Sequence, residues 1–593
     1  MPTNSQVREL IAPHIAGGWR PKAEKTIDIT QIFDGRNVRV IDDGGIHPRP
    51  GYENSGIDFT TLSVTKFRGG VSAQSPKLLW IAYDNGTNVK IVYIDTDAET
   101  IYDTGLSLTT GYYVCMLEFE GDIYYANGVD TDGRIIVGQV ATGGVVAAAD
   151  NLDLKPGRGA FFGTTGTGRI QGTDVFTWGA KAGDELQSIP TSGGNAIGAA
   201  YAADVVVIST TTISPVYQTN ASILEEWLAS LNLAGDPEYP RVWEFSKFAL
   251  ASTPANFYSF SAAPAGAELV GKNSIITGLK SAHNFFYVWK KESLHSVDRN
   301  TVSITTGARV PQPMTDQFGI PNNRCHCEMN GRIAYLTTNK RLIPIEIILE
   351  SGQNSPRIDA EFDRAVRPFL ATIDDPGDDE WIHFNQENQL LKVGVFVDLV
   401  RQVLVYDAEI GIFYPPDTNK NFDMMIFHDN KSYAGDGSAQ ILFIDEIGNY
   451  DHDIPVDWFW QTGRHGIRGS AKDFQRGILR YVYLHGKMTR NSQAWVDVYK
   501  NNVFQFTKLL TDARIVVDDE GTPIGSKGYG SAGFGHGGDA PRAYEFRLPI
   551  GANKPGLDWS IVVRSDGERG DFVQCDGFIL GLEPRRSYPY NHA

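Results

Sequence analysis

Two thiols and an imidazole stand together at Cys325, His326 and Cys327, and these are residue types that bind zinc. One residue separates the two cysteines, so on a strand both would point to one face and His326 to the other. Structural zinc takes four ligands, and no second pair stands close by in the sequence. We therefore interpret the two cysteines as a buried pair, with a metal site as the alternative.

Carboxylates also occur at alternate positions before a glycine, in Asp130-Thr131-Asp132-Gly133, as at the start of a calcium-binding loop. The later ligands of an EF-hand are missing, which favours a β-turn. The same interpretation applies to Asp42-Asp43-Gly44 and Asp518-Asp519-Glu520-Gly521. We predict no metal site and no cofactor.

Hydrolysis of a glycosidic bond needs two carboxylates across a cleft, and the run from Asp374 to Glu380 beside Trp381 supplies acidic groups. Runs of this kind are usually solvated loops. The chain contains no nucleophile elbow, no HExxH and no P-loop, and its Ser, His and Asp residues show no spacing that selects a triad. We predict that the protein is not an enzyme and has no catalytic residue.

Basic residues interleaved with aromatic ones mark the segment from 458 to 487. This pattern suits a protein partner or DNA, and it also suits a strand surface whose cations guard an edge; we favour the strand surface. The residues are Arg464, Arg468, Lys472, Arg476, Arg480 and Lys487, with Trp458, Trp460, Tyr481 and Tyr483.

The composition indicates the type of secondary structure on which these candidate residues lie. Among 593 residues there are 62 Gly, 30 Phe and 25 Tyr, and few helical patterns, which predicts an all-β protein. The net charge of −18 argues against binding DNA along the whole chain by phosphate neutralisation. Four cysteines cannot build a dense disulfide framework, and neither a signal peptide nor a membrane-spanning run is visible. We expect synthesis in a cytoplasm.

Residues 33–51, FDGRNVRVIDDGGIHPRPG, show the pattern that the rest repeats: a strand, a turn of Asp and Gly, and a return strand ending at Arg49-Pro50-Gly51. Roughly six later units of about 25 to 40 residues follow the same pattern, which is typical of propeller blades. We predict that the hairpin closes or seeds this ring.

The repeat of strands and turns divides the chain into predicted regions. It fails between 141 and 274, where Ser222 to Leu231 forms the best amphipathic helix, and strands become longer after 445. The predicted regions are 1–61, an N-terminal arm and closing hairpin; 62–140, blades; 141–274, an inserted platform; 275–445, blades; and 446–593, an antiparallel β-sandwich.

The Asn-x-Arg strand at 37–39, the Gly-Gly-Ile turn at 44–46, the Arg-Pro-Gly exit and Gly17-Gly18 upstream resemble the N-terminal region of β-propeller tail proteins of short-tailed bacteriophages. These are the tail nozzle or tubular proteins and the related DNA-stabilisation proteins. The resemblance covers roughly 15–140, 275–445 and 540–585.

The resemblance implies a structural virion protein, a homo-hexameric ring below the portal and adaptor ring of the tail. Such a ring would retain the genome and pass double-stranded DNA during ejection without sequence-specific binding. The partners implied are the adaptor or head-to-tail connector and the tail fibres or spikes. The alternative class is a carbohydrate-binding or carbohydrate-active propeller.

Two segments are candidate functional sites within that interpretation. The helix at 222–231 would dock to a neighbour through Trp227 beside Glu225 and Glu226, because a lone aromatic is often an interface anchor. The glycine-rich segment 525–542 would form a gate at the narrow end of an acidic channel. Its candidate gate residues are Gly528, Tyr529, Phe534 and His536.

Overall fold

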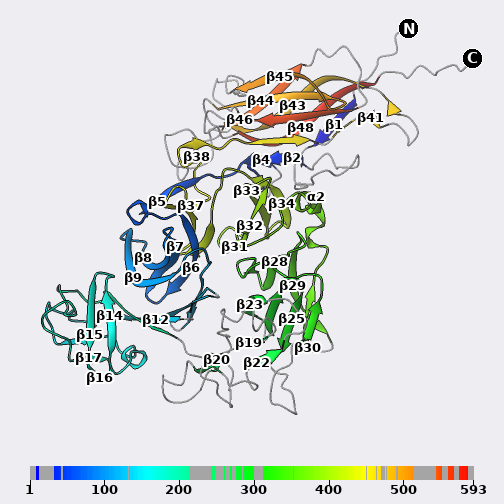
Figure 1. The fold of residues 1–593 in the computed structure, drawn as a ribbon. Coiled ribbons are helices and arrows are strands. Elements are labelled where there is room, and N and C mark those ends of the chain that lie inside the picture. Colours follow the sequence, from blue (N-terminus) through cyan, green and yellow to red (C-terminus); the bar gives the residue numbers. More distant parts are fainter. Residues whose placement is uncertain are drawn as a thin grey trace, which may run out of the picture.

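The computed structural model confirms an all-β protein (Figure 1). The helical segments among the described residues are single turns: η1 (Thr60–Leu62), η2 (Gly159–Phe161), η4 (Phe362–Ala365) and α2 (Arg367–Leu370). The residues described are 8–12, 32–41, 45–119, 121–127, 129–130, 133–212, 242–244, 246–247, 259–260, 267–269, 276–282, 285–298, 312–350, 353–448, 450–462, 464–465, 467–468, 474–475, 477–488, 492–511, 542–549, 558–565 and 573–584.

Four sheets are antiparallel meanders of four consecutive strands. Sheet 1 contains β6 (Lys66–Gln74), β7 (Lys77–Asp84), β8 (Asn88–Asp95) and β9 (Thr100–Thr109). Sheet 3 contains β23 (Ile276–Ala282), β24 (Phe285–Lys290), β25 (Leu294–Asp298) and β26 (Gln312–Thr315). Sheet 4 contains β27 (His326–Met329), β28 (Arg332–Leu336), β29 (Leu342–Glu350) and β30 (Gln353–Ile358). Sheet 5 contains β31 (Trp381–Asn385), β32 (Leu390–Val397), β33 (Val400–Asp407) and β34 (Ile412–Asp417).

Two further sheets recruit strands from elsewhere in the chain. Sheet 2 runs in the order β10 (Cys115–Phe119), β11 (Asp122–Ala126), β12 (Gly133–Gln139), β18 (Val206–Thr212), β14 (Gly166–Ile170), β15 (Asp174–Trp178). Sheet 6 runs in the order β35 (Met424–His428), β36 (Lys431–Asp436), β37 (Ile441–Asp445), β5 (Tyr52–Asp58), β38 (Tyr450–Asp451), β39 (Ile454–Pro455). The six sequence units that we expected each form a sheet.

Neighbouring sheets meet through their first strands. β27 contacts β31, β31 contacts β35, β35 contacts β6, and β6 contacts β10. Sheet 3 packs on sheet 4, where the Trp289 ring stacks on His326 with centroids 4.9 Å apart. The order is therefore 3, 4, 5, 6, 1, 2, as in a series of blades, and a propeller is our interpretation of it.

Both ends of the chain build a second body, which Figure 1 shows above the six sheets. One of its sheets orders β3 (Val38–Ile41), β4 (Gly45–Pro48), β48 (Val573–Pro584), β43 (Gly477–Met488) and β46 (Arg542–Pro549), and β1 (Arg8–Ala12) also pairs with β48. The other orders β2 (Ile32–Arg36), β40 (Phe459–Thr462), β47 (Trp559–Arg564), β44 (Gln493–Lys500) and β45 (Val503–Thr511). The rings of Trp460 and Phe578 lie across the gap with centroids 6.3 Å apart, so the sheets form a sandwich.

The N-terminal hairpin does not close the ring, which corrects our expectation. Strands β3 and β4 pair with each other and join the sandwich where Ile46 lies opposite Cys575. The next strand is the one that joins the six sheets, because β5 pairs antiparallel with β37 inside sheet 6. The region predicted as 1–61 is thus divided between the sandwich and sheet 6.

The predicted platform also differs from the structure. Val206–Thr212 pairs with all seven residues of β12, so β18 belongs to sheet 2 although it falls inside 141–274. The described insertion lies before it and adds β14, β15 and a small sheet of β13 (Asn151–Asp153), β17 (Glu185–Gln187) and β16 (Ala180–Ala182). Three two-stranded sheets also occur: β19 (Val242–Glu244) with β22 (Ala267–Leu269), β20 (Ser246–Lys247) with β21 (Ser259–Phe260), and β41 (Ile467–Arg468) with β42 (Phe474–Gln475).

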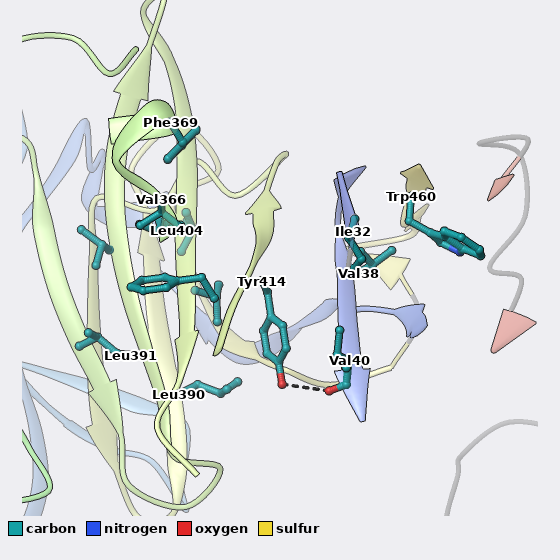
Figure 2. Close-up of a cluster of buried hydrophobic side chains, with 14 of the residues drawn as sticks. Ile32, Val38, Val40, Val366, Phe369, Leu390, Leu391, Leu404, Tyr414 and Trp460 are labelled. Carbon is teal, nitrogen blue, oxygen red and sulfur yellow. Dashed lines mark hydrogen bonds between the residues drawn. The ribbon is translucent and has the colours of Figure 1, made fainter. Parts of the chain in front are cut away.

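The sandwich and sheet 5 share one apolar core. Ile32, Val38 and Val40 from β2 and β3 are at most 4% exposed and belong to the same buried cluster as Leu391 and Leu404 of sheet 5. Figure 2 shows Tyr414 between the two groups, its hydroxyl donating to the carbonyl of Val40 at 3.0 Å. Burial of this joint fixes the sandwich on sheet 5.

Candidate functional site

A cluster of buried charges lies where the N-terminal hairpin meets sheets 5 and 6. Arg39, on β3, donates from Nη1 and Nη2 to the two carboxylate oxygens of Asp417 at 2.7 and 2.6 Å. Arg49, just after β4, donates in the same two-pronged way to Asp451 at 2.8 and 2.5 Å. Both guanidinium groups are almost fully buried, so these are bidentate pairs without competing water.

Two lysines complete the cluster. Lys392 Nζ lies 2.6 Å from both Asp445 and Glu446, and Lys420 Nζ lies 2.7 Å from Asp445 and 3.3 Å from Glu446 and from Asp417. We call the set Arg39, Arg49, Lys392, Lys420, Asp417, Asp445, Glu446 and Asp451 the charge network. Its cations and carboxylates are equal in number, which is how buried charges can be tolerated.

Asn37 holds the network to both bodies. Its φ of 55° is left-handed, a conformation that asparagine tolerates better than most residues. Its amide oxygen accepts from the backbone of Thr418 and from Arg49 Nε, and its amide nitrogen donates to the carbonyl of Asp457. One side chain therefore ties the hairpin to the end of sheet 5 and to the start of the sandwich.

Electrostatics fix the charges of the network at neutral pH. Burial raises the pKa of Asp417, but the charges of Arg39 and Lys420 outweigh it and bring the pKa down to about 2. The same balance lowers the pKa values of Asp445 and Glu446. Burial, and then the charges of nearby cations, keep the adjacent His47 and His383 neutral.

The pKa of His47 falls to about 4 and that of His383 to about 3. Asp417, Asp445 and Glu446 are thus held ionised and the two histidines neutral, whereas burial raises the pKa of Asp451. Charges paired in this way are suited to holding the fold together.

A second polar cluster lies where the first strands of several sheets begin. The backbone amide of Val114 donates to the carbonyl of Arg68, that of Ile382 to Arg324, and that of Phe67 to the carboxylate of Asp423. These contacts bring the starts of β6, β10, β31 and β35 together. We call the polar residues gathered there the axial cluster: Lys66, Tyr113, Arg324, Asp379, Glu380, Arg401 and Asp423.

Asp379 of the predicted acidic run is at the centre of the axial cluster. Its carboxylate accepts from Lys66 Nζ and from the hydroxyl of Tyr113, and the guanidinium carbon of Arg324 lies 3.4 Å from the centroid of the Tyr113 ring. Burial raises the pKa of Asp379, but the hydrogen bonds from Lys66 and Tyr113 outweigh it, so the pKa is lowered. Asp379 is held as an ion-paired carboxylate.

The other acids of that run have separate contacts. Asp374 accepts from the amides of Asp398 and Leu399 at 3.2 and 2.9 Å, and Asp375 pairs with Lys340 at 2.9 Å. Glu380 is buried and accepts from the amide of Gly377 at 2.7 Å. The carboxylates of the run thus fasten different loops.

The cysteine pair and the calcium-like turn carry no metal cluster among the described residues. Cys325 is fully buried and Cys327 is partly buried, and burial raises the pKa of both thiols, which disfavours the metal-binding thiolate. The carboxylate of Asp130 accepts from the amide and hydroxyl of Thr109 and from the amide of Asn127, so it braces a turn. Asp132, Asp42, Asp43 and the segment 518–521 lie outside the described residues.

The two tryptophans of the basic segment are buried, whereas its two tyrosines are partly exposed. Trp458 and Trp460 are 1% and 2% exposed and lie in the core. Arg480 pairs with Glu583, and β43, which carries it, lies between β48 and β46 rather than at an edge. The tryptophans therefore stabilise the sandwich rather than face a partner, and the basic strand surface that carries Arg480 and the exposed Lys487 is not an edge of its sheet.

The sequence-predicted interface and gate residues lie outside the described residues. They are Trp227, Glu225 and Glu226 for the interface, and Gly528, Tyr529, Phe534 and His536 for the gate. No described helix is long and apolar enough to cross a membrane.

Sequence reasoning missed the charge network, although two signals were present. Lys392 interrupts the apolar strand Leu390–Val397, and a lysine on a strand buried on both faces needs a buried partner. Arg39 and Arg49 both lie in the stretch that carries the phage-tail resemblance. Their partners are more than 370 residues away in the chain, so no local pattern could have identified them.

No protein-family model matches this chain, and no curated protein matches it. Among solved structures, an exo-β-1,3-galactanase from Phanerochaete chrysosporium with galactose is 8% identical, with a TM-score of 0.18, over 97% of this chain and 100% of that chain. A variant of that galactanase with β-1,3-galactotriose is 9% identical at the same TM-score and coverage. A TM-score of 0.18 supports no conclusion about the fold or function of this protein.

Proposed function

We propose that this protein is a structural component of the tail of a short-tailed bacteriophage, a ring subunit that extends the DNA channel. The stretch that resembles tail nozzle proteins includes Arg39 and Arg49, and these two residues anchor the charge network. The network is the observation that carries the proposal, because it fastens the N-terminal hairpin of the sandwich to sheets 5 and 6. A subunit that must hold a pressurised genome needs a joint of this kind.

The remainder of the proposal rests on the resemblance. The subunits form a homo-hexamer below the adaptor ring, contact tail fibres or spikes, and pass double-stranded DNA without reading its sequence. The protein is made in the host cytoplasm and resides in the virion. The net charge of −18 supports a wall that DNA slides past, since like charges repel.

A carbohydrate-binding or carbohydrate-active role is the second candidate, and the axial cluster is the observation that favours it. Tyr113, Arg324 and Glu380 place an aromatic ring, a donor and an acceptor just before the starts of first strands. Against catalysis, the carboxylate of Asp379 is already bound by Lys66 and Tyr113. We expect no activity that depends on a single Asp, Glu, His or Ser.

Negative-stain microscopy of the purified protein and of its native particle tests the proposal. Six-fold rings at the tail support it. Monomers that cleave or bind a glycan, with the effect lost in Asp379→Asn or Glu380→Gln but kept in Asp375→Asn, whose side chain is 97% exposed, would favour the second candidate.

Two deletions test the finer assignments. Removing 218–236 should spare folding and disrupt assembly, and insoluble protein would count against the interface. Particles with a shortened 525–542 segment should lose DNA earlier on mild heating. Retention of DNA equal to that of the parent would reject the gate and leave the ring subunit untouched.

A further inference from the structure

Two guanidinium groups of the axial cluster lack a carboxylate partner. Arg324 donates from Nη1 to the carbonyl of Asp423 at 2.8 Å and from Nη2 to the carbonyl of Asp378 at 2.6 Å. Arg401 donates from Nη2 to the carbonyl of Asp379 at 3.0 Å. Among the described residues neither forms an ion pair with a side chain, and Nε of Arg324 and Nη1 of Arg401 have no hydrogen-bond partner.

The carboxylates closest to these arginines have other donors. Asp379 is bound by Lys66 and Tyr113, and Asp423 by the amides of Phe67 and Gly437. Glu380 accepts from the amide of Gly377. Both arginines are therefore near acids that face other groups, and their own direct acceptors are neutral carbonyls.

Aromatic rings hold the two guanidinium groups in place. The Arg324 group lies over Tyr113, and the Arg401 group lies 3.9 Å from the centroid of Phe396. Arg401 is only 6% exposed, and burial, followed by the charge of Arg324, lowers its pKa. An unpaired donor on a buried guanidinium is unfavourable, and an anion that enters would relieve it.

We infer that Arg324 and Arg401 form a binding site for a small oxyanion, a phosphate or a carboxylate, at the start of the first strands. Planar guanidinium groups bind such groups through paired N–H donors. Arg324 is only partly buried and gives the anion its approach from solvent. The ligand comes either as free phosphate or as an acidic side chain of a partner. The inference does not depend on the proposed function.

Calorimetric titration of the full chain with inorganic phosphate in low-chloride buffer at pH 7.5 tests this inference. We expect saturable binding of one phosphate per chain, weakened by added chloride. Arg324→Gln should lower the affinity at least tenfold, and Arg324→Lys, which keeps the charge but not the paired donors, should lower it less. Arg332→Gln is the matched control, because Arg332 pairs with Glu346 with its side chain 46% exposed, and it should bind as the parent does.

A parallel titration with acetate identifies the source of the anion. Acetate binding without phosphate binding assigns the site to a carboxylate and keeps the inference. Arg401→Gln should act like Arg324→Gln. If it fails to fold, as a circular dichroism spectrum would reveal, the Arg324 variants decide alone. Absence of saturable binding of either anion, or binding that Arg324→Gln leaves unchanged, overturns the site.

Discussion

Arg39 and Asp417 are 378 positions apart in the chain, and two hydrogen bonds of 2.7 and 2.6 Å join them in the interior. Arg39 belongs to a hairpin of the sandwich, and Asp417 is the last residue of sheet 5. Lys420 and Glu446 contact the same pair, which extends the joint to the end of sheet 6. The bond between these two residues is therefore where three parts of the protein are fastened.

Removing one member of this joint should destabilise the protein strongly. Asp417→Ala leaves Arg39 and Lys420 with less compensation in the interior, and we expect the free energy of unfolding to fall by about 3–5 kcal/mol. Urea denaturation followed by tryptophan fluorescence measures this. In the control Arg36→Ala the lost pair with Asp457 is about two-fifths exposed, so the loss should stay below about 1 kcal/mol. Equal losses in the two variants would contradict a structural role for the network.

Acid should weaken the protein in two stages. His383 has a pKa lowered to about 3 by burial and by Lys392, so its contribution to stability is complete above its unfolded pKa of about 6.5 and declines as the pH falls below that value. Asp417, with a pKa lowered to about 2, contributes fully above about pH 4 and loses that contribution as the pH falls toward 2. The first stage belongs to the buried histidines and the second to the network.

The variant His383→Gln separates the stages. It should flatten the fall in stability between pH 6.5 and 4.5 by on the order of 2 kcal/mol and leave the steeper loss below pH 4. Melting temperatures across this range measure the effect. His452→Gln, at an exposed histidine, serves as the control. An unchanged slope in His383→Gln would show that His383 does not resist protonation.

The local parts of this fold follow from the sequence, and the long-range pairings do not. The sequence Asp84-Asn85-Gly86 is typical of a hairpin turn, and in the structure Gly86 has a φ of 84° while the Asn85 side chain accepts from the amide of Asn88. These turn preferences belong to single residues, so a few neighbouring residues of the sequence are enough to predict the turn. The all-β class follows from the same windows.

Which strand closes which sheet depends on distant packing. Nothing within residues 52–58 indicates that their partner strand is 441–445. The alternation of apolar and polar residues in the hairpin 38–48 is equally compatible with a propeller and with a sandwich. For the candidate site, the sequence drew attention to the acidic run 374–380 but favoured a solvated loop, and it gave no indication of Arg324 or Arg401. Their roles come from the carbonyls and rings around them, which belong to different loops.

Leu399 offers a test of backbone strain. It occupies the left-handed region at φ 65° although it is 86% exposed, so its side chain gains little from burial. Leu399→Asn should raise the free energy of unfolding by about 0.5–1 kcal/mol, since asparagine tolerates this conformation. The reverse change, Asn419→Leu at φ 64°, should lower it by a similar amount. Thermal denaturation of both variants tests whether the two changes in the free energy of unfolding have opposite signs. A loss of stability in Leu399→Asn would show that the Leu399 side chain makes a stabilising contact.

Closure of sheet 6 by the N-terminal strand predicts a specific crosslink. Glu53 on β5 lies directly opposite Ile444 on β37, and opposite residues of an antiparallel pair have their Cβ atoms about 4.5–5.5 Å apart on one face. Glu53→Cys combined with Ile444→Cys should therefore form a disulfide on oxidation. Because the crosslink spans most of the chain, we expect it to stabilise the folded state by about 2–4 kcal/mol.

Non-reducing electrophoresis and melting with and without reductant measure the crosslink. Glu53→Cys alone should show neither a mobility change nor a reductant-dependent melting temperature, which makes it the control. The two positions are far apart in the sequence, so rapid oxidation requires that β5 lie beside β37. Failure of the double variant to oxidise while it remains folded would place β5 elsewhere and would reject the closure. Oxidation that leaves the melting temperature unchanged would keep the pairing and show that opening of sheet 6 does not limit stability.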